Sequence, residues 1–125
     1  MWYKLIGLGV AGACGALARY GLAGLFQRGQ QMGFPWGTLT VNVLGCFLFG
    51  LIWTLTQQRF AVSPDTRTIV LVGFLGSFTT FSAFLFETDQ MLEHAEWFVA
   101  GLNLAGELGL GLLAYLLGTL LGRMV

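Results

Sequence analysis

One uncharged stretch of the sequence, from Thr68 to Phe86, joins an apolar composition to residues that weaken a helix. Its centre reads GSFTTFSAF (Gly76–Phe84). A helix interrupted inside a membrane leaves backbone carbonyls and amides that lipid cannot satisfy, and cavities or bound ions supply their partners. The pattern therefore predicts a broken helix that handles an ion or a polar solute, although a kinked packing helix has the same pattern. The residues expected to interrupt the helix are Gly73, Gly76, Ser77, Thr79 and Thr80.

Two phenylalanines of this stretch, Phe81 and Phe84, are three residues apart and therefore share one face of a helix. Phenylalanine pairs at this spacing are usually plain packing residues. The edge of an aromatic ring carries partial positive charge, however, and can face an anion. The sequence leaves both interpretations open.

Three further polar residues fall inside apolar segments, where a charge is costly. Arg19 is either a snorkelling arginine whose guanidinium reaches the membrane interface or a fixed positive charge that attracts anions. Asn42, one turn after Thr38, is most simply a residue that hydrogen-bonds between helices. Glu107, one turn after Asn103, must be protonated, paired or hydrated, and Arg19 is a possible partner for it.

Four apolar segments must position these side chains. Of 125 residues, 56% are hydrophobic and 10% are charged, against about 25% charged in an ordinary soluble domain, and the mean hydropathy is +0.76. A bilayer core needs about 20 apolar residues for each helix that crosses it. We therefore expect one all-α integral membrane domain over residues 1–125, with four transmembrane helices and a broken third helix. The expected helices cover residues 5–26, 37–56, 66–86 and 97–121.

The composition also excludes several classes of function. A net charge of +0 gives no electrostatic case for nucleic-acid binding. Cys14 and Cys46 fall within the expected spans and are interpreted as small hydrophobic residues, so that neither a disulfide nor a metal site is predicted. We find no nucleophile with a neighbouring base, and the sequence does not predict an enzyme.

The basic residues predict an orientation. With four spans, both termini and the central loop share one side of the membrane, and the other side holds Arg28 alone near its loops. The positive-inside rule then places the termini in the cytoplasm. The basic residues on the terminal side are Lys4, Arg59, Arg67 and Arg123. The acidic residues expected to face outward are Glu87, Asp89, Glu93 and Glu96.

Four motifs of the sequence resemble the small Fluc (CrcB-type) fluoride channels, and the resemblance covers essentially the whole chain. The most specific is GFLGSFTTFSAF (Gly73–Phe84), because its glycines, paired threonines and Phe-Ser-x-Phe follow one another without a gap. GTLTVNVLG (Gly37–Gly45) supports it strongly. The two weaker motifs are GACGALARY (Gly12–Tyr20) and NLAGE (Asn103–Glu107).

The resemblance implies an antiparallel, dual-topology dimer of four-helix subunits in a bacterial inner membrane. Two pores, each lined by both subunits, would pass fluoride out of the cytoplasm down its electrochemical gradient. By the same resemblance, Phe81 and Phe84 present ring edges to fluoride, Asn42 donates its amide hydrogens to it, and Arg19 lies in the vestibule.

The resemblance also implies roles for backbone and hydroxyl groups of the third helix. Thr38, Thr80 and Ser82 match hydroxyl positions near the pore. Backbone carbonyls of Gly76 and Thr79, from both subunits, are expected to hold a structural Na⁺ at the centre of the dimer. No organic cofactor is implied.

The fourth helix departs from the family pattern. Glu107 stands where the family usually has a serine, and Gly111 replaces a threonine one turn later, in a polar track beside the pore phenylalanines. A charged carboxylate at this place repels fluoride, whereas a neutral one donates a hydrogen bond as serine does. We expect Glu107 to be mostly neutral and to make the track sensitive to pH.

Two alternative functions stay open. The four-to-one distribution of basic residues is unequal for a chain that inserts in both directions, so the chain is alternatively one subunit of an obligate heterodimeric fluoride channel. A small proton-coupled dual-topology exporter that uses Glu107 is the other alternative, although such exporters place their essential carboxylate in helix one.

Overall fold

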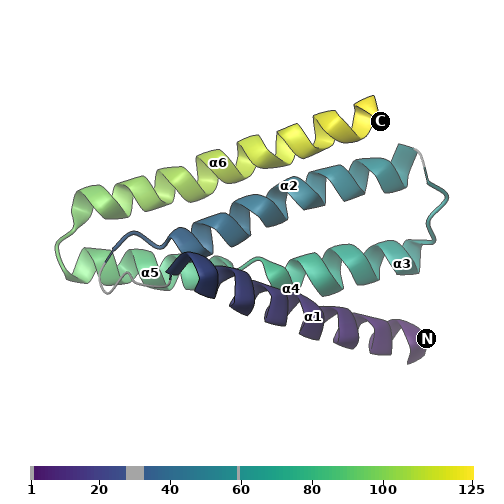
Figure 1. The fold of residues 1–125 in the computed structure, drawn as a ribbon, viewed down its shortest axis with the longest axis horizontal. Coiled ribbons are helices and arrows are strands. Elements are labelled where there is room, and N and C mark those ends of the chain that lie inside the picture. Colours follow the sequence, from purple (N-terminus) through teal and green to yellow (C-terminus); the bar gives the residue numbers. More distant parts are fainter. Residues whose placement is uncertain (1, 28–32, 59) are drawn as a thin grey trace.

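The computed structural model describes residues 2–27, 33–58 and 60–125, and these contain four helical spans long and apolar enough to cross a membrane (Figure 1). The spans are α1 (Trp2–Gln27), α2 (Trp36–Gln58), a composite third span (Pro64–Glu93) and α6 (Trp97–Met124). The predicted all-α, four-helix membrane fold is thus confirmed. Each expected range lies within the observed span, and the third span continues seven residues beyond the expected end at 86.

The third span is interrupted, as the sequence predicts. It begins with α3 (Pro64–Thr68), widens into the π-helical segment η1 (Ile69–Leu75) and returns to α-helix in α4 (Gly76–Phe78). Thr79 and Thr80 are extended, with ψ of 159° and 108°, before α5 (Phe81–Glu93) begins. Gly76 itself keeps right-handed helical angles, so the break lies three residues after the glycine.

Side-chain caps explain where the pieces of this span begin. The Ser63 hydroxyl accepts from the Thr66 N–H at 3.1 Å, and a proline follows Ser63 at the first position of α3. The Thr80 hydroxyl accepts from the Ala83 N–H at 3.2 Å and so starts α5. Thr80 is therefore part of the break and also the capping residue of the helix that begins at Phe81.

The helices pack as two pairs. Figure 1 shows α6 and α2 running side by side, with α1 crossing the third span on the other side. A buried cluster joins α2 to the third span through Val41, Leu71, Leu75 and Phe78. Gly15 is the one buried residue among those of α1, so most of that helix faces outward.

The contact between α2 and α6 is a backbone contact at Gly118. A β-carbon at this position would lie 2.1 Å from the carbonyl oxygen of Phe47, well inside the contact distance of two heavy atoms. Small residues allow such close approach between helices in lipid, where packing replaces the hydrophobic effect. At Gly109, on the same helix, the equivalent position has no heavy atom within 4 Å from the rest of the described chain, apart from the neighbouring residues and the backbone of its own helix.

Polar contacts tie the N-terminus of α1 to the start of α3. Lys4 Nζ lies 2.9 Å from Asp65 Oδ1, and the Tyr3 hydroxyl donates to the same carboxylate. The Arg67 guanidinium lies 5.4 Å from the centre of the Trp53 ring, linking α3 to α2. These contacts lie at the end of the bundle that holds both termini (Figure 1).

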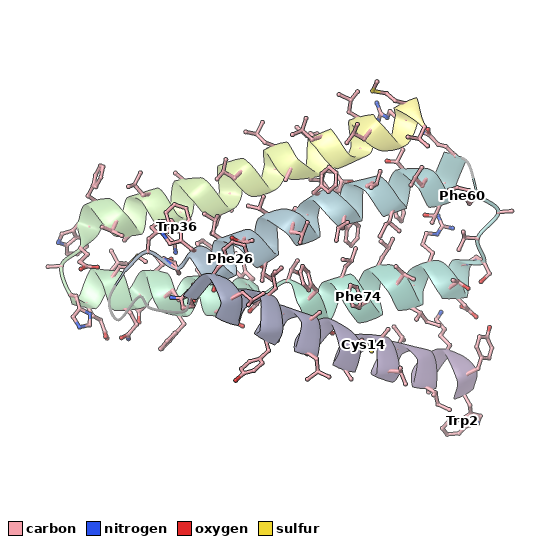
Figure 2. All side chains as sticks on the ribbon, in the orientation of Figure 1. Trp2, Cys14, Phe26, Trp36, Phe60 and Phe74 are labelled. Carbon is pink, nitrogen blue, oxygen red and sulfur yellow. The ribbon has the colours of Figure 1, made fainter. Side chains whose placement is uncertain are left out.

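Aromatic side chains lie toward both ends of the bundle, as expected at membrane interfaces. Figure 2 shows Trp2 and Phe60 at the end with the termini, and Phe26 and Trp36 toward the opposite end. Arg28 and Arg59, on which the predicted orientation partly depends, lie outside the described residues. The orientation therefore stays a prediction.

Replacing Gly118 by alanine should destabilise the fold by about 1–3 kcal/mol, because the added methyl group overlaps the Phe47 carbonyl. The free energy of unfolding in detergent measures this loss. Gly109→Ala is the matched control and should change stability by less than about 0.5 kcal/mol. Equal losses in the two variants would contradict a backbone contact at Gly118.

Candidate functional site

The side chain of Asn42 forms hydrogen bonds with the backbone at the break in the third span. Its Oδ1 accepts from the Thr80 N–H at 2.7 Å, and its Nδ2 donates to the Thr80 carbonyl at 3.0 Å. In a continuous helix the Thr80 N–H would bond to the Gly76 carbonyl. The amide thus satisfies both backbone groups of Thr80 and leaves Gly76 without its helical donor.

Asn42 also reaches the fourth span. Its Nδ2 donates to Glu107 Oε2 at 3.0 Å, so both amide hydrogens are used within the chain. Only 8% of Glu107 is exposed, and its Oε1 is buried with no hydrogen-bond partner among the described residues. Asn42 therefore joins α2, the break and α6 in one contact.

Arg19 does not pair with Glu107. Within the described ranges the one ion pair is that of Lys4 with Asp65. The Arg19 guanidinium instead points to the break, where its Nη1 lies 3.5 Å from the Thr79 carbonyl oxygen. The possible Arg19–Glu107 pair is therefore absent from the structure, because the two side chains line different pockets.

The first pocket, here the phenylalanine pocket, has a volume of about 320 Å³ and a mostly apolar wall. Phe81 and Phe84 both line it and are in edge-to-face contact, with ring centres 5.4 Å apart and planes at 61°. Phe84 is 3% exposed and Phe81 is 66% exposed in the single chain. The polar groups in its wall belong to Asn42, Thr79, Thr80, Glu107 and Tyr115, together with the thiol of Cys46.

The second pocket, here the arginine pocket, has a volume of about 820 Å³ and a more polar wall. Thr80 lines both pockets, so the break separates one from the other. The Thr38 hydroxyl donates to Glu87 Oε1 at 2.6 Å in this wall. The polar residues in it are Arg19, Tyr20, Gln27, Thr38, Thr80, Ser82 and Glu87.

The structure thus distributes the predicted site residues between the two pockets. Asn42, Phe81, Phe84 and Glu107 come together in the phenylalanine pocket. Arg19, Thr38 and Ser82 come together in the arginine pocket. Gly76 is the first residue of α4, and Thr79 follows its last residue, where the helical backbone stops.

Glu87 is a polar residue of the site that the expected third span, ending at residue 86, does not include. It lies within α5, half-buried, and its Oε2 is buried without a partner among the described residues. The spacing of Glu87 from apolar residues indicates that it belongs to the same helix. Glu87 follows the buried Phe84 by three residues and precedes the buried Met91 by four, which places all three on one helical face.

Asn103 supports the same region from α6. It is fully buried, and its Nδ2 donates to the Thr88 hydroxyl at 2.9 Å. The Thr88 hydroxyl in turn donates to the Phe84 carbonyl at 2.8 Å. This chain of hydrogen bonds fixes α5 against α6 beside the phenylalanine pocket.

The family profile and the similar known proteins agree on one family. The profile of the family described as "CrcB-like protein, Camphor Resistance (CrcB)" matches residues 6–119. A protein of Nitrosococcus oceani is 48% identical over 125 residues, and one of Desulforapulum autotrophicum is also 48% identical over 125, with all of both chains covered in each case. A protein of Nitratidesulfovibrio vulgaris (strain Miyazaki F) is 49% identical over 122 residues, 98% of each chain. All three relatives carry the name "Fluoride-specific ion channel FluC".

Replacing Asn42 by alanine should destabilise the protein by about 1–3 kcal/mol for each buried group that loses its partner, and the Thr80 N–H and carbonyl are two such groups. Thermal unfolding measures the loss, and hydrogen exchange at the Thr80 amide should accelerate. Thr56→Val is the control, because the Thr56 hydroxyl bonds only to carbonyls of its own helix. Unchanged exchange at Thr80 in Asn42→Ala would contradict the closure of the break by this amide.

Proposed function

This chain belongs to the CrcB-like family, and from that premise we propose that it is a fluoride-selective channel that exports cytoplasmic fluoride passively. It is a multi-pass membrane protein with four spanning helices. Its similar relatives are named as ion channels rather than as enzymes. Fluoride accumulates in cells because HF crosses membranes and dissociates in a less acidic cytoplasm. A negative membrane potential then drives the anion outward through an open path, with no nucleotide or organic cofactor.

The observation that carries this proposal is the meeting of the two phenylalanine rings with the start of α5 in one pocket. The first turn of a helix carries partial positive charge, and so does the edge of an aromatic ring. Phe81 opens α5, and the ring of Phe84 follows one turn later. The pocket therefore offers an anion several partial positive charges without a fixed cation that would hold it.

Asn42 contributes to anion binding by exchanging partners. Both of its amide hydrogens are bound within the chain, one to the Thr80 carbonyl and one to Glu107. The amide hydrogen that Asn42 donates to Glu107 is the one available to a passing anion, because the other is bound to the Thr80 carbonyl at the break. Fluoride is small and strongly hydrated, and a donor in the wall replaces part of its water.

The arginine pocket serves as the vestibule in this proposal. The fixed charge of Arg19 raises the local concentration of anions. Thr38, Thr80 and Ser82 place hydroxyl groups along the wall, and that of Thr38 donates to Glu87. Thr80 borders both pockets and marks the place where fluoride would pass from one to the other.

A second copy of the chain completes the pore in this proposal. Phe81 is 66% exposed in the single chain although it lines the pocket, so one wall is missing. An antiparallel homodimer supplies that wall twice and yields two pores.

The same dimer brings together two copies of the carbonyl groups at the break. Gly76 is exposed and its carbonyl has lost its helical donor to Asn42, while the Thr79 carbonyl has the Arg19 guanidinium at 3.5 Å. Freed carbonyls at the C-terminal end of a broken helix are suitable ligands for Na⁺. The Gly76 and Thr79 carbonyls would hold this structural ion, whose charge offsets the carbonyl dipoles between subunits.

Glu107 favours a second candidate function. A buried carboxyl in a pocket of a small four-span protein is also what a proton-coupled dual-topology exporter needs. Such an exporter requires a proton gradient, whereas a channel does not. An obligate heterodimeric channel is the other alternative, and it predicts that the purified chain alone does not transport fluoride.

Fluoride efflux from liposomes that contain only this protein tests the proposal. We expect rapid loss of fluoride, retention of chloride and no effect of a protonophore. Phe81→Ile should slow the efflux at least about tenfold, an added barrier of about 1.4 kcal/mol or more, because the aliphatic side chain has no positive edge. Phe98→Ile is the matched control, since Phe98 is 78% exposed and lines neither pocket.

Three outcomes would contradict parts of the proposal. Efflux that stops without a proton gradient identifies an exporter. Silence in folded, dimeric protein excludes a self-sufficient homodimeric channel. Equal efflux in Phe81→Ile and the wild type removes the phenylalanine edge from the mechanism.

A further inference from the structure

Glu107 places a carboxyl group with one free oxygen in the wall of the phenylalanine pocket. Its Oε2 accepts from Asn42 at 3.0 Å, while its Oε1 is buried and has no partner among the described residues. The residue as a whole is more than nine-tenths buried. A buried polar atom without a partner is costly, so this oxygen needs a ligand or a proton.

The two protonation states of this carboxyl have opposite effects on an anion. The carboxylate is negative, takes a hydrogen of Asn42 and offers only lone pairs to the pocket. The neutral acid carries no charge, offers an O–H donor and is a weaker acceptor for Asn42. Protonation therefore removes the negative charge that repels an anion, adds an O–H donor and weakens the bond that holds the Asn42 amide hydrogen.

Among the residues that the structure describes, no basic side chain lines the phenylalanine pocket and could pair with the carboxylate. The titratable groups nearest along the pocket are Cys46 on α2 and Tyr115 on α6 itself. Glu87 on α5 is a further acidic group, bound to Thr38 in the arginine pocket. Arg19 on α1 also lines the arginine pocket and points to the Thr79 carbonyl.

We propose that Glu107 determines when the phenylalanine pocket accepts an anion: the protonated carboxyl donates a hydrogen bond to fluoride, and the carboxylate excludes it. This inference rests on the proposed channel function and deepens it, because it makes the conducting state a protonated state. The proton stays on Glu107 throughout, and no covalent bond forms or breaks. Fluoride moves alone, so the flux needs no proton gradient although its rate depends on pH.

The experiment compares the pH dependence of fluoride efflux in three proteins, with the same pH on both sides of the liposome. In the wild type, the rate should fall as pH rises, approaching tenfold for each pH unit above the midpoint, because the protonated fraction falls in that way. Glu107→Gln keeps an uncharged donor and should conduct at every pH with a flat profile. Glu93→Gln removes an exposed carboxyl at the end of α5 and should keep the wild-type profile. Protein-free liposomes measure the leak of HF, which is subtracted.

Infrared spectroscopy of the same proteins provides a readout that does not depend on transport. The carbonyl band of a protonated carboxyl should disappear from the wild-type spectrum over the pH range in which efflux falls. Glu107→Gln should lack the titrating band at all pH values. The half-buried Glu87 has one buried carboxyl oxygen and can contribute a similar band, so the difference between wild-type and Glu107→Gln spectra assigns the band of Glu107.

The outcomes separate this inference from the channel itself. A flat wild-type profile, or a Glu107→Gln variant that keeps the slope, overturns the role of Glu107 and leaves the channel intact. A wild-type band that does not titrate with efflux has the same meaning. If the wild type and Glu107→Gln are both silent at every pH while folded, the channel proposal fails and this inference fails with it.

Discussion

The pairing of the Asn42 amide with the backbone of Thr80 is the interaction on which the rest of the site depends. An extended residue inside a membrane span has an N–H and a carbonyl that lipid cannot satisfy. One side chain on the neighbouring helix satisfies both groups. Because these bonds hold Thr79 and Thr80 extended, α5 can begin anew at Phe81 with its own axis and its own positive end.

The surrounding packing explains how such a break is tolerated. The pair α2–α6 approaches to backbone contact and forms the regular side of the bundle, and Asn42 lies on this side. The third span packs against α2 through a compact apolar cluster and carries the irregular segments. The irregular backbone is therefore supported from a regular neighbour, and the two pockets lie on either side of that support.

The sequence predicted the four spans and the broken third helix because both follow from local composition. Hydropathy and length define the spans, and the hydroxyl residues after Gly76 mark a weak helix. The break falls at Thr79 and Thr80, two of the five residues expected to interrupt the helix, whereas Gly76 stays helical. Which of the five become extended could not be derived from composition, because it depends on the partner that Asn42 offers across the bundle.

Side-chain partners were the least predictable part of the site. Asn42 does bond between helices, as the simplest interpretation held, but the backbone of Thr80 as its partner is not visible in the sequence. Glu87 was grouped with residues of the loop because hydropathy ends the span too early, although its spacing from Phe84 placed it on the buried face. Glu107 was recognised as unusual because it is alone, and its contact with Asn42 rather than Arg19 required the fold. The fluoride, sodium and dimer assignments still rest on family resemblance.

The π-helical turn η1 changes the phase of the third span. Its wider turns hold each N–H to the carbonyl five residues earlier, as Gly76 bonds to Leu71. Leu71 and Leu75 are buried against Val41 of α2, whereas Gly73 is buried against Leu8 and Ala11 of α1, so η1 is buried on two faces. A helical wheel drawn through the whole span would therefore assign its faces wrongly on one side of η1. In the evolution of this segment, deletion of one residue within η1 would rotate the preceding part of the span relative to the break. An apolar substitution would leave that rotation unchanged.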